Sequence, residues 1–375
     1  MRLLISILSA LIIYSSYAQN EDCDNRYQSE IFQDVLVQTV TYSDNYNLLM
    51  DVYTPVGDTY TNRPLLIFAH GGVFIGGSKT NPTMINLCES FAKRGFVTAS
   101  INYRLATHSS VLGAGGILWM LGLDNGIKVL YSAMSDAKAA IRFFRKDFVE
   151  NLNSYGIDPN QIWMGGSSAG AALALHLNFV NSEEEFLSGI DESSHDYVLD
   201  LLDQNGGLEG LSGNLGYSSE INGLINLAGA LHNLEWIDST DLNPVVSCHG
   251  TDDETVPADC STIYDNPLFL SICGSQEIHP VLDELLITNS YLPFVSEGHV
   301  PWEYSSAIRE EMVDFVGEFI YQNINCQLIK TIDSQKTKTL MYQNDLLGRQ
   351  TVRGQSGFVF NFYNDGTILK TYIFE

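Results

Sequence analysis

One serine in the sequence lies between glycines, at the point where a strand-like pattern gives way to a helix-like one. Residues 161–170 read QIWMGGSSAG, and a G-x-S-x-G motif in this run centres on Ser168. A serine at such a sharp strand-to-helix turn is held in a strained conformation that only small neighbours allow. Choosing Ser167 instead would place Ala169 where the closing glycine belongs. The motif therefore predicts that Ser168 is a nucleophile.

The serine needs a base, and His299 is the best candidate in the sequence. A serine hydroxyl is a weak nucleophile until an imidazole takes its proton. Of the eight histidines, His299 follows an apolar strand-like run, and Gly298 frees the backbone to present the ring from a loop. His249 stands directly at a strand end and His176 on the helix after the serine. We expect His249 to be structural and His176 to be packed in the interior.

The base in turn needs a carboxylate that fixes its tautomer and stabilises the imidazolium. Residues 245–257 read VVSCHGTDDETVP, in which a buried strand pattern leads into a loop with three acids. We choose Asp253, with Asp252 as its serious rival and Glu254 third. Adjacent loop residues cannot be ranked by spacing alone. The chain order of the three groups is then serine, aspartate, histidine.

A glycine pair after a strand pattern is suited to stabilising an oxyanion. Residues 68–74 read FAHGGVF, and the two glycines let the backbone approach a ligand closely. We expect the donors to be the backbone N–H groups of Gly72 and Val73, joined by that of Ala169 after the nucleophile. This chemistry needs no cofactor. The chain also lacks the CxxC and HExxH patterns that indicate metal sites.

The elements that would position these residues follow a strand–helix alternation. Helical spacing of apolar residues predicts helices over 133–148, with Phe148 on the buried side, and over 308–319. Short apolar runs predict buried strands at 64–69, 96–101, 162–164, 224–228, 245–248 and 292–295. The simplest fold is α/β, a doubly wound, mostly parallel sheet with helices on both faces.

Two segments interrupt the alternation, residues 105–132 and residues 181–220. Long insertions in a compact domain are often lids or binding loops. The alternative, which the sequence favours equally, is that they are surface loops without such a role, because long loops are well tolerated. The first contains an apolar cluster, residues 117–120, which would suit acyl chains or aromatic polyesters.

Charge and the N-terminal residues narrow the function classes. The 375 residues carry 19 Lys and Arg against 45 Asp and Glu, a net charge of −26. Such a chain repels nucleic acid and anionic membranes. Residues 1–18 have the plan of a cleaved secretory signal, whose apolar run is shorter than the about 20 residues of a membrane span. We expect no transmembrane segment in the mature protein.

Cysteine usage agrees with an exported chain. The mature sequence contains six cysteines, an even number that suits disulfides. Sequence alone cannot choose their pairing, although Cys260 and Cys273 enclose a short loop and are the favoured pair.

At this point the chain resembles the secreted carboxylesterases of the α/β-hydrolase superfamily that carry HGG at the oxyanion loop. The resemblance covers about residues 35–325. It rests on seven segments: HGG (70–72), INYRL (101–105), DAKAA (136–140), YGIDP (155–159), GGSSAG (165–170), HGTDD with VP (249–257) and GH (298–299). It implies the α/β-hydrolase fold and supports Asp253. Many relatives have a third glycine where this chain has Val73, and the β-branched side chain would narrow the acyl pocket.

The resemblance implies a serine carboxylic-ester hydrolase that forms an acyl-enzyme with a small-molecule or polymer-borne ester. Similar proteins include feruloyl and acetyl-xylan esterases. Two alternatives stay open: a serine peptidase of the same fold, and a non-catalytic surface binding protein on a hydrolase scaffold.

The C-terminal residues differ from the rest. Residues 327–375 carry six bases and four acids, whereas the residues before them are strongly acidic. This shift in charge predicts a boundary near residue 326, with a catalytic domain at 19–326 and a small β appendage at 327–375. Alternating aromatic residues around 364–366 predict a β-hairpin. With DLLGR at 345–349, this tail resembles the sorting domain of the type IX secretion system. The machinery of that system would be a partner, and the protein would be secreted or held at the outer cell surface. An accessory β-domain is the alternative.

Overall fold

The structure is a computed structural model of the chain. It describes residues 25–188, 190–324, 340–345, 357–363 and 368–373. The predicted signal and two of the cysteines, Cys23 and Cys326, lie outside these residues. The chain forms two compact units, Met1–Asn325 and Cys326–Glu375, and each is described by itself.

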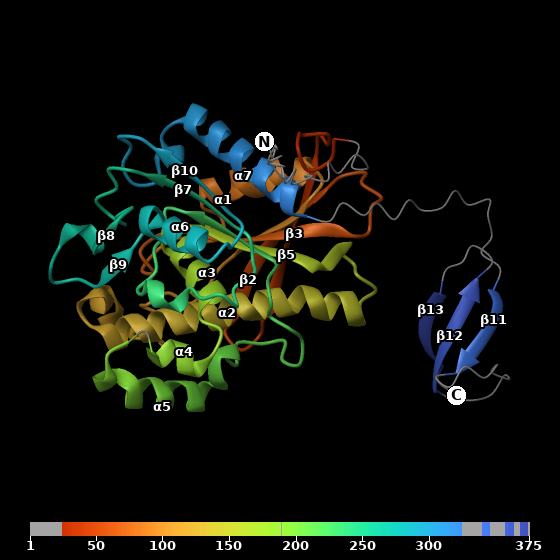
Figure 1. The fold of residues 1–375 in the computed structure, drawn as a ribbon, viewed down its shortest axis with the longest axis horizontal. Coiled ribbons are helices and arrows are strands. Elements are labelled where there is room, and N and C mark those ends of the chain that lie inside the picture. The colour runs from red at the N-terminus through yellow and green to blue at the C-terminus, as the bar shows by residue number, and fades with distance from the viewer. Residues whose placement is uncertain (1–24, 189, 325–339, 346–356, 364–367, 374–375) are drawn as a thin grey trace, which may run out of the picture. The chain divides into compact units, whose positions relative to one another are not determined.

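An eight-stranded sheet forms the centre of the first unit (Figure 1). Its strands, in chain order, are β1 (Val35–Ser43), β2 (Leu48–Pro55), β3 (Arg63–Ala69), β4 (Val97–Ile101), β5 (Ile157–Ser167), β6 (Gly223–Leu227), β7 (Val245–Gly250) and β10 (Asn289–Phe294). Their spatial order is β1-β2-β4-β3-β5-β6-β7-β10. The pairs β1–β2 and β2–β4 are antiparallel and all other pairs are parallel. The predicted, mostly parallel sheet is confirmed, with β1 and β2 as additions that the sequence did not indicate.

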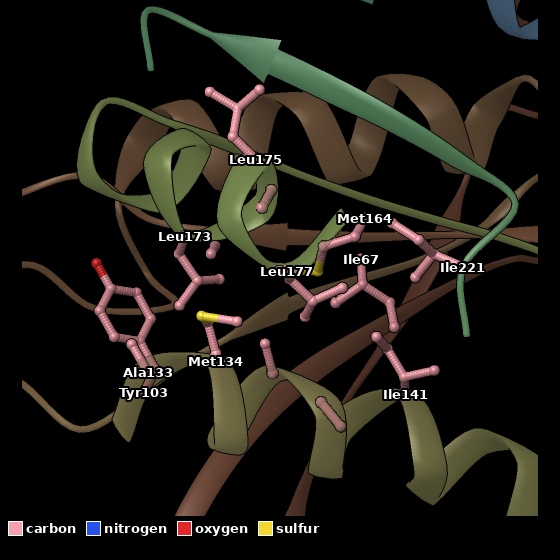
Figure 2. Packing of buried hydrophobic residues seen from close by; sticks show 14 of the residues in the cluster. Ile67, Tyr103, Ala133, Met134, Ile141, Met164, Leu173, Leu175, Leu177 and Ile221 are labelled. Carbon is pink, nitrogen blue, oxygen red and sulfur yellow. The ribbon is translucent and has the colours of Figure 1, made fainter. Parts of the chain in front are cut away.

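Helices cover both faces of this sheet, as predicted. The principal ones are α1 (Pro82–Lys93), α2 (Leu123–Glu150), α3 (Ala169–Phe179), α6 (Ser275–Glu284) and α7 (Ser306–Asn323). Figure 1 shows α1 and α7 on one face, and α2 and α3 on the other. Figure 2 shows the packing of the second face, where Met134 of α2 and Leu173 of α3 lie with Ile67 of β3.

One prediction about α2 is wrong. Phe148 was expected to face the core, and it is 38% exposed. In the last turn of the helix the buried position belongs to Asp147, whose carboxylate accepts a hydrogen bond from the Ser154 hydroxyl (2.6 Å). The helix also begins ten residues earlier than the expected start at 133, so residues 123–132 belong to α2.

The two predicted insertions form small helices packed on the main body. Residues 105–122 contain the 3₁₀ helix η1 (Gly113–Leu121). Residues 181–220 contain α4 (Glu183–Ser188), η2 (Glu192–Ser194), α5 (His195–Asn205) and η3 (Gly207–Glu209). Glu209 forms ion pairs with two side chains of α2, since its carboxylate lies 3.0 Å from both the Lys138 ammonium and the Arg142 guanidinium. Lid movement of either segment stays a prediction.

The predicted disulfide Cys260–Cys273 is present and joins the short antiparallel strands β8 (Cys260–Thr262) and β9 (Ser271–Cys273). Cys88 and Cys248 are buried free thiols, and burial raises the pKa of both above its ordinary value. The even number of cysteines therefore does not mean that every cysteine pairs.

The second unit contains an antiparallel sheet of three strands, β11 (Leu340–Asp345), β12 (Gly357–Tyr363) and β13 (Ile368–Ile373). The hairpin predicted around residues 364–366 is present as β12 paired with β13, and its turn lies outside the described residues. Among the helices that the structure describes, none has the length and apolar character required to cross a membrane.

Candidate active site

Ser168 occupies a strained turn between β5 and α3. Its backbone has φ 56° and ψ −121°, in a region that residues other than glycine rarely adopt. Its N–H donates to the carbonyl of Leu227 on the neighbouring strand (2.8 Å). A Cβ atom at Gly170 would lie 2.1 Å from the carbonyl oxygen of Ala69, and one at Gly166 would lie 2.6 Å from the same atom. Glycine is therefore required at both positions, by the close approach of β3 and, at Gly166, also by the carbonyl of Gly170.

The structure brings His299 to the serine. Its ring lies in the loop after β10, with Nε2 2.8 Å from Ser168 Oγ and Nδ1 2.6 Å from Asp253 Oδ2. A carboxylate only accepts hydrogen bonds, so Nδ1 carries the proton and Nε2 is left to accept from the serine hydroxyl. This is the tautomer that a general base requires.

Burial distinguishes Asp253 from its rivals. Asp253 is 5% exposed, whereas Asp252 and Glu254 are exposed. Its second oxygen, Oδ1, accepts the backbone N–H groups of Thr255 and Val256, each at 2.9 Å. The loop after β7 thus holds the carboxylate with one oxygen directed at His299.

His249 also contacts this carboxylate, which sequence reasoning missed. The ring is fully buried, and Nε2 lies 2.9 Å from the Val256 carbonyl and 3.3 Å from Asp253 Oδ2. Nδ1 is 2.9 Å from Ser275 Oγ. Burial by itself raises the pKa of Asp253, but hydrogen bonds from His249 and His299 outweigh it and hold the pKa well below its ordinary value. His249 is therefore a buried residue that helps to hold the Asp253 carboxylate in its ionised form.

The glycine pair lies directly against the nucleophile. A Cβ atom at Gly71 would be 3.2 Å from that of Ser168. Gly72 has φ 118°, and a Cβ there would lie 2.3 Å from the Gly76 carbonyl oxygen. Among the described residues, no acceptor is hydrogen-bonded to the N–H of Gly72 or Val73. The N–H of Ala169 is at the first position of α3, where no intrahelical acceptor exists. Within the part of the chain that the structure describes, none of the three predicted donors is therefore hydrogen-bonded to another protein group.

An apolar cavity of about 100 Å³ opens beside Ser168, Val73 and Ala169. By the same measure a single water molecule needs roughly 10–15 Å³, so the cavity can hold a group of several atoms. Its walls come from segments far apart in the chain. Among the lining residues are Phe74, Trp119, Ile127, Leu130, Phe186, Ile190, Trp236, Val256, Ile263, Leu270 and Ile272.

Of the predicted cluster at 117–120, Trp119 lines the cavity and Leu118 is 59% exposed. Phe186 belongs to the predicted insertion 181–220 and Trp236 does not, and no local pattern marks either side chain as part of a cavity.

His176, expected to be packed, lies in the wall of this cavity. It is 4% exposed; its Nδ1–H donates to the Ala172 carbonyl (2.7 Å), and Nε2 accepts from the backbone N–H of His232 (3.3 Å). Burial lowers the pKa of His176 to about 4. The His176 side chain therefore stays uncharged at neutral pH.

Comparisons with known proteins show what the chain is similar to. The family model BD-FAE matches residues 50–113. A probable isoprenylcysteine alpha-carbonyl methylesterase of Oryza sativa subsp. japonica is 30% identical over 170 residues, which are 45% of this chain and 34% of that protein. Fumonisin B1 esterase of Sphingopyxis macrogoltabida is 30% identical over 154 residues, 39% of this chain and 25% of that protein. The chain thus spans about a third or less of these two relatives.

Among solved structures, esterase 2 of Thermogutta terrifontis phosphorylated by paraoxon superimposes with a TM-score of 0.54 at 19% identity. The match covers 76% of this chain and 93% of that one. The apo form of the same esterase gives the same values. The chain has the α/β-hydrolase fold that the sequence predicted.

The buried histidine makes stability depend on pH. His176 has a pKa near 6.5 in the unfolded chain and about 4 in the folded one. Between these two pH values it is largely protonated in the unfolded chain and largely neutral in the folded one. The free energy of unfolding therefore falls as pH drops from 6.5 towards 4. We predict that His176→Gln reduces the loss of stability between pH 8 and pH 5 by about 1–2 kcal/mol, measured by urea denaturation.

The two proteins compared at pH 8, where the imidazole is neutral in both states, give the packing cost of the substitution alone. Equal pH dependence in wild type and variant would contradict the prediction.

Proposed function

We propose that the chain is a serine carboxylic-ester hydrolase. The observation that carries this proposal is the hydrogen-bonded row Ser168–His299–Asp253. Beside the serine lie backbone N–H groups that donate to no described residue, and an apolar cavity. The esterases among the similar proteins support the same chemistry.

The geometry suggests a division of roles. Ser168 Oγ attacks the ester carbonyl carbon while His299 Nε2 takes the hydroxyl proton, and the ionised Asp253 stabilises the resulting imidazolium. The N–H groups of Gly72, Val73 and Ala169 bind the oxyanion, each worth about 2.7–4 kcal/mol of barrier. Collapse of the intermediate expels the alcohol, which receives the proton from His299. Water then attacks the acyl-enzyme by the same route.

The cavity favours esters with an uncharged acyl group of modest size. Its walls are largely aliphatic and aromatic, and the buried His176 among them is neutral, so a charged acyl group would lose most of its hydration on entering. Feruloyl, acetyl and short aliphatic acyl groups all meet this condition, on a small molecule or on a polymer.

Replacement of the nucleophile tests the proposal. We predict that Ser168→Ala lowers kcat on p-nitrophenyl acetate and butyrate by at least about 10⁴-fold. Ser167→Ala is the matched control: Ser167 is adjacent and 2% exposed, and its hydroxyl is hydrogen-bonded to no described residue. It should retain activity. Methyl ferulate and a peptide anilide complete the panel, since cleavage of the anilide alone would identify a peptidase, and no turnover would favour a binding protein.

The carboxylate gives a second test. We predict that Asp253→Asn lowers kcat by about 10⁴-fold, because an asparagine stabilises the wrong tautomer of His299. Asp252→Asn, on the exposed neighbour, should remain within about threefold of wild type. Loss of activity in the second variant alone would transfer the role to Asp252. Steady-state kinetics on p-nitrophenyl butyrate measures both.

We further propose that the protein is exported and that residues 327–375 direct it through the type IX secretion machinery. The support is the signal-like pattern at 1–18, DLLGR at 345–349 and the Cys260–Cys273 disulfide, a bond typical of oxidising compartments.

In a bacterium that has this machinery, we predict that the full chain reaches the medium or outer surface. A chain ending at residue 326 should stay in the periplasm with its esterase activity intact. Immunoblots of the fractions measure the outcome, and export that does not require the tail would contradict it.

A further inference from the structure

The oxyanion loop contains two consecutive strained residues. Val73 has φ 56° and Phe74 has φ 55°, both in the left-handed region. For residues with a Cβ atom, and above all for a β-branched valine, this conformation is unfavourable and persists only where surrounding contacts impose it. The N–H of Val73 is one of the proposed oxyanion donors, so these contacts bear directly on the chemistry.

The contacts come from the insertion that precedes α2. The indole N–H of Trp119 donates to the Val73 carbonyl at 2.9 Å, and its ring meets the Phe74 ring edge-on at 5.5 Å. The N–H of Ala106 donates to the Phe74 carbonyl at 2.7 Å. Trp119 is 7% exposed, so these interactions are shielded from water. The insertion at residues 105–122 thus holds the oxyanion loop through Trp119 and Ala106.

The bond to the Val73 carbonyl restrains the peptide group that follows the donor N–H. Without it, Val73 can relax toward an ordinary backbone conformation, and its N–H would turn away from the serine. An oxyanion hole works because its donors are already aligned when charge develops. The interaction therefore contributes to the transition state more than to binding of the ester.

We propose that Trp119 is a positioning residue that holds the oxyanion loop through its indole N–H, in addition to forming a wall of the cavity. This rests on the proposed ester hydrolysis. Access to the cavity and alignment of the oxyanion donors would then depend on one side chain.

Trp236 provides a matched control. It is 1% exposed, lines the same cavity, and its indole N–H donates to a backbone carbonyl, that of Glu185, at 2.9 Å. Tryptophan to phenylalanine at either position removes the same atoms and one indole–carbonyl hydrogen bond. Only the change at 119 touches the oxyanion loop.

The experiment compares Trp119→Phe and Trp236→Phe on p-nitrophenyl acetate and butyrate. We expect Trp119→Phe to lower kcat about 10- to 100-fold on both esters, since loss of a whole donor costs about 10²–10³. KM should change as well, in a way that depends on chain length, because Trp119 also lines the cavity. We expect Trp236→Phe to change KM in a way that depends on chain length, and to lower kcat on both esters by a clearly smaller factor than Trp119→Phe does. Binding of a trifluoromethyl ketone, which forms an oxyanion with the serine, should weaken in parallel with kcat/KM for Trp119→Phe only.

A benzothienylalanine at position 119 separates the hydrogen bond from packing, because sulfur replaces the N–H at nearly constant ring shape. We expect the same fall in kcat for this variant. It replaces Trp119→Phe in the experiment if Trp119→Phe does not fold. Wild-type kcat in this variant would overturn the inference, and so would equal losses of kcat in Trp119→Phe and Trp236→Phe. Either result is compatible with the proposed ester hydrolysis if Ser168→Ala still abolishes turnover. Absence of turnover by the wild-type protein would instead contradict the proposed function itself.

Discussion

The close approach of β3 and β5 at their carboxyl ends is the constraint on which the candidate site depends. The carbonyl of Ala69 lies so near the turn after β5 that a Cβ atom at Gly166 or Gly170 would overlap it. Because the chain continues from Ala69 into the glycine pair, this approach also presses Gly71 against Ser168. Nucleophile and oxyanion donors are therefore adjacent as a consequence of strand packing, and glycine is the residue that permits it.

Electrostatics determines how the base is held. A buried carboxylate is costly unless its oxygens are hydrogen-bonded, and Asp253 meets this requirement with two backbone N–H groups and two imidazoles. Each bond favours the ionised form, and the two backbone bonds to Oδ1 leave Oδ2 to face the imidazoles of His299 and His249. Since Oδ2 can only accept, the proton of His299 must reside on Nδ1. The tautomer needed for catalysis thus follows from the way the loop after β7 folds.

Sequence patterns predicted what depends on local chain properties. Continuous apolar runs marked the buried parallel strands, and the glycine motifs marked the turns. Strand β1 gave no such signal because Leu36 and Val37 are both exposed at its start, which obscures the alternation of an edge strand. The choice between Asp252 and Asp253 depended on burial, and the second imidazole at His249 on a contact between loop and strand. Neither can be read from spacing.

The cavity and the reacting groups have different origins in the fold, and this affects how specificity can change. Ser168, Asp253 and His299 follow the ends of three sheet strands, where positions are set by the core. A large part of the cavity wall comes instead from α2, from Phe186 and Ile190, and from the β8–β9 hairpin. Substitutions in these walls can alter the accepted acyl group without moving the triad. Trp119 breaks this separation because it contacts both the cavity and the Val73 carbonyl. At this position a change that enlarges the cavity also releases the oxyanion loop, so size and rate cannot be selected independently.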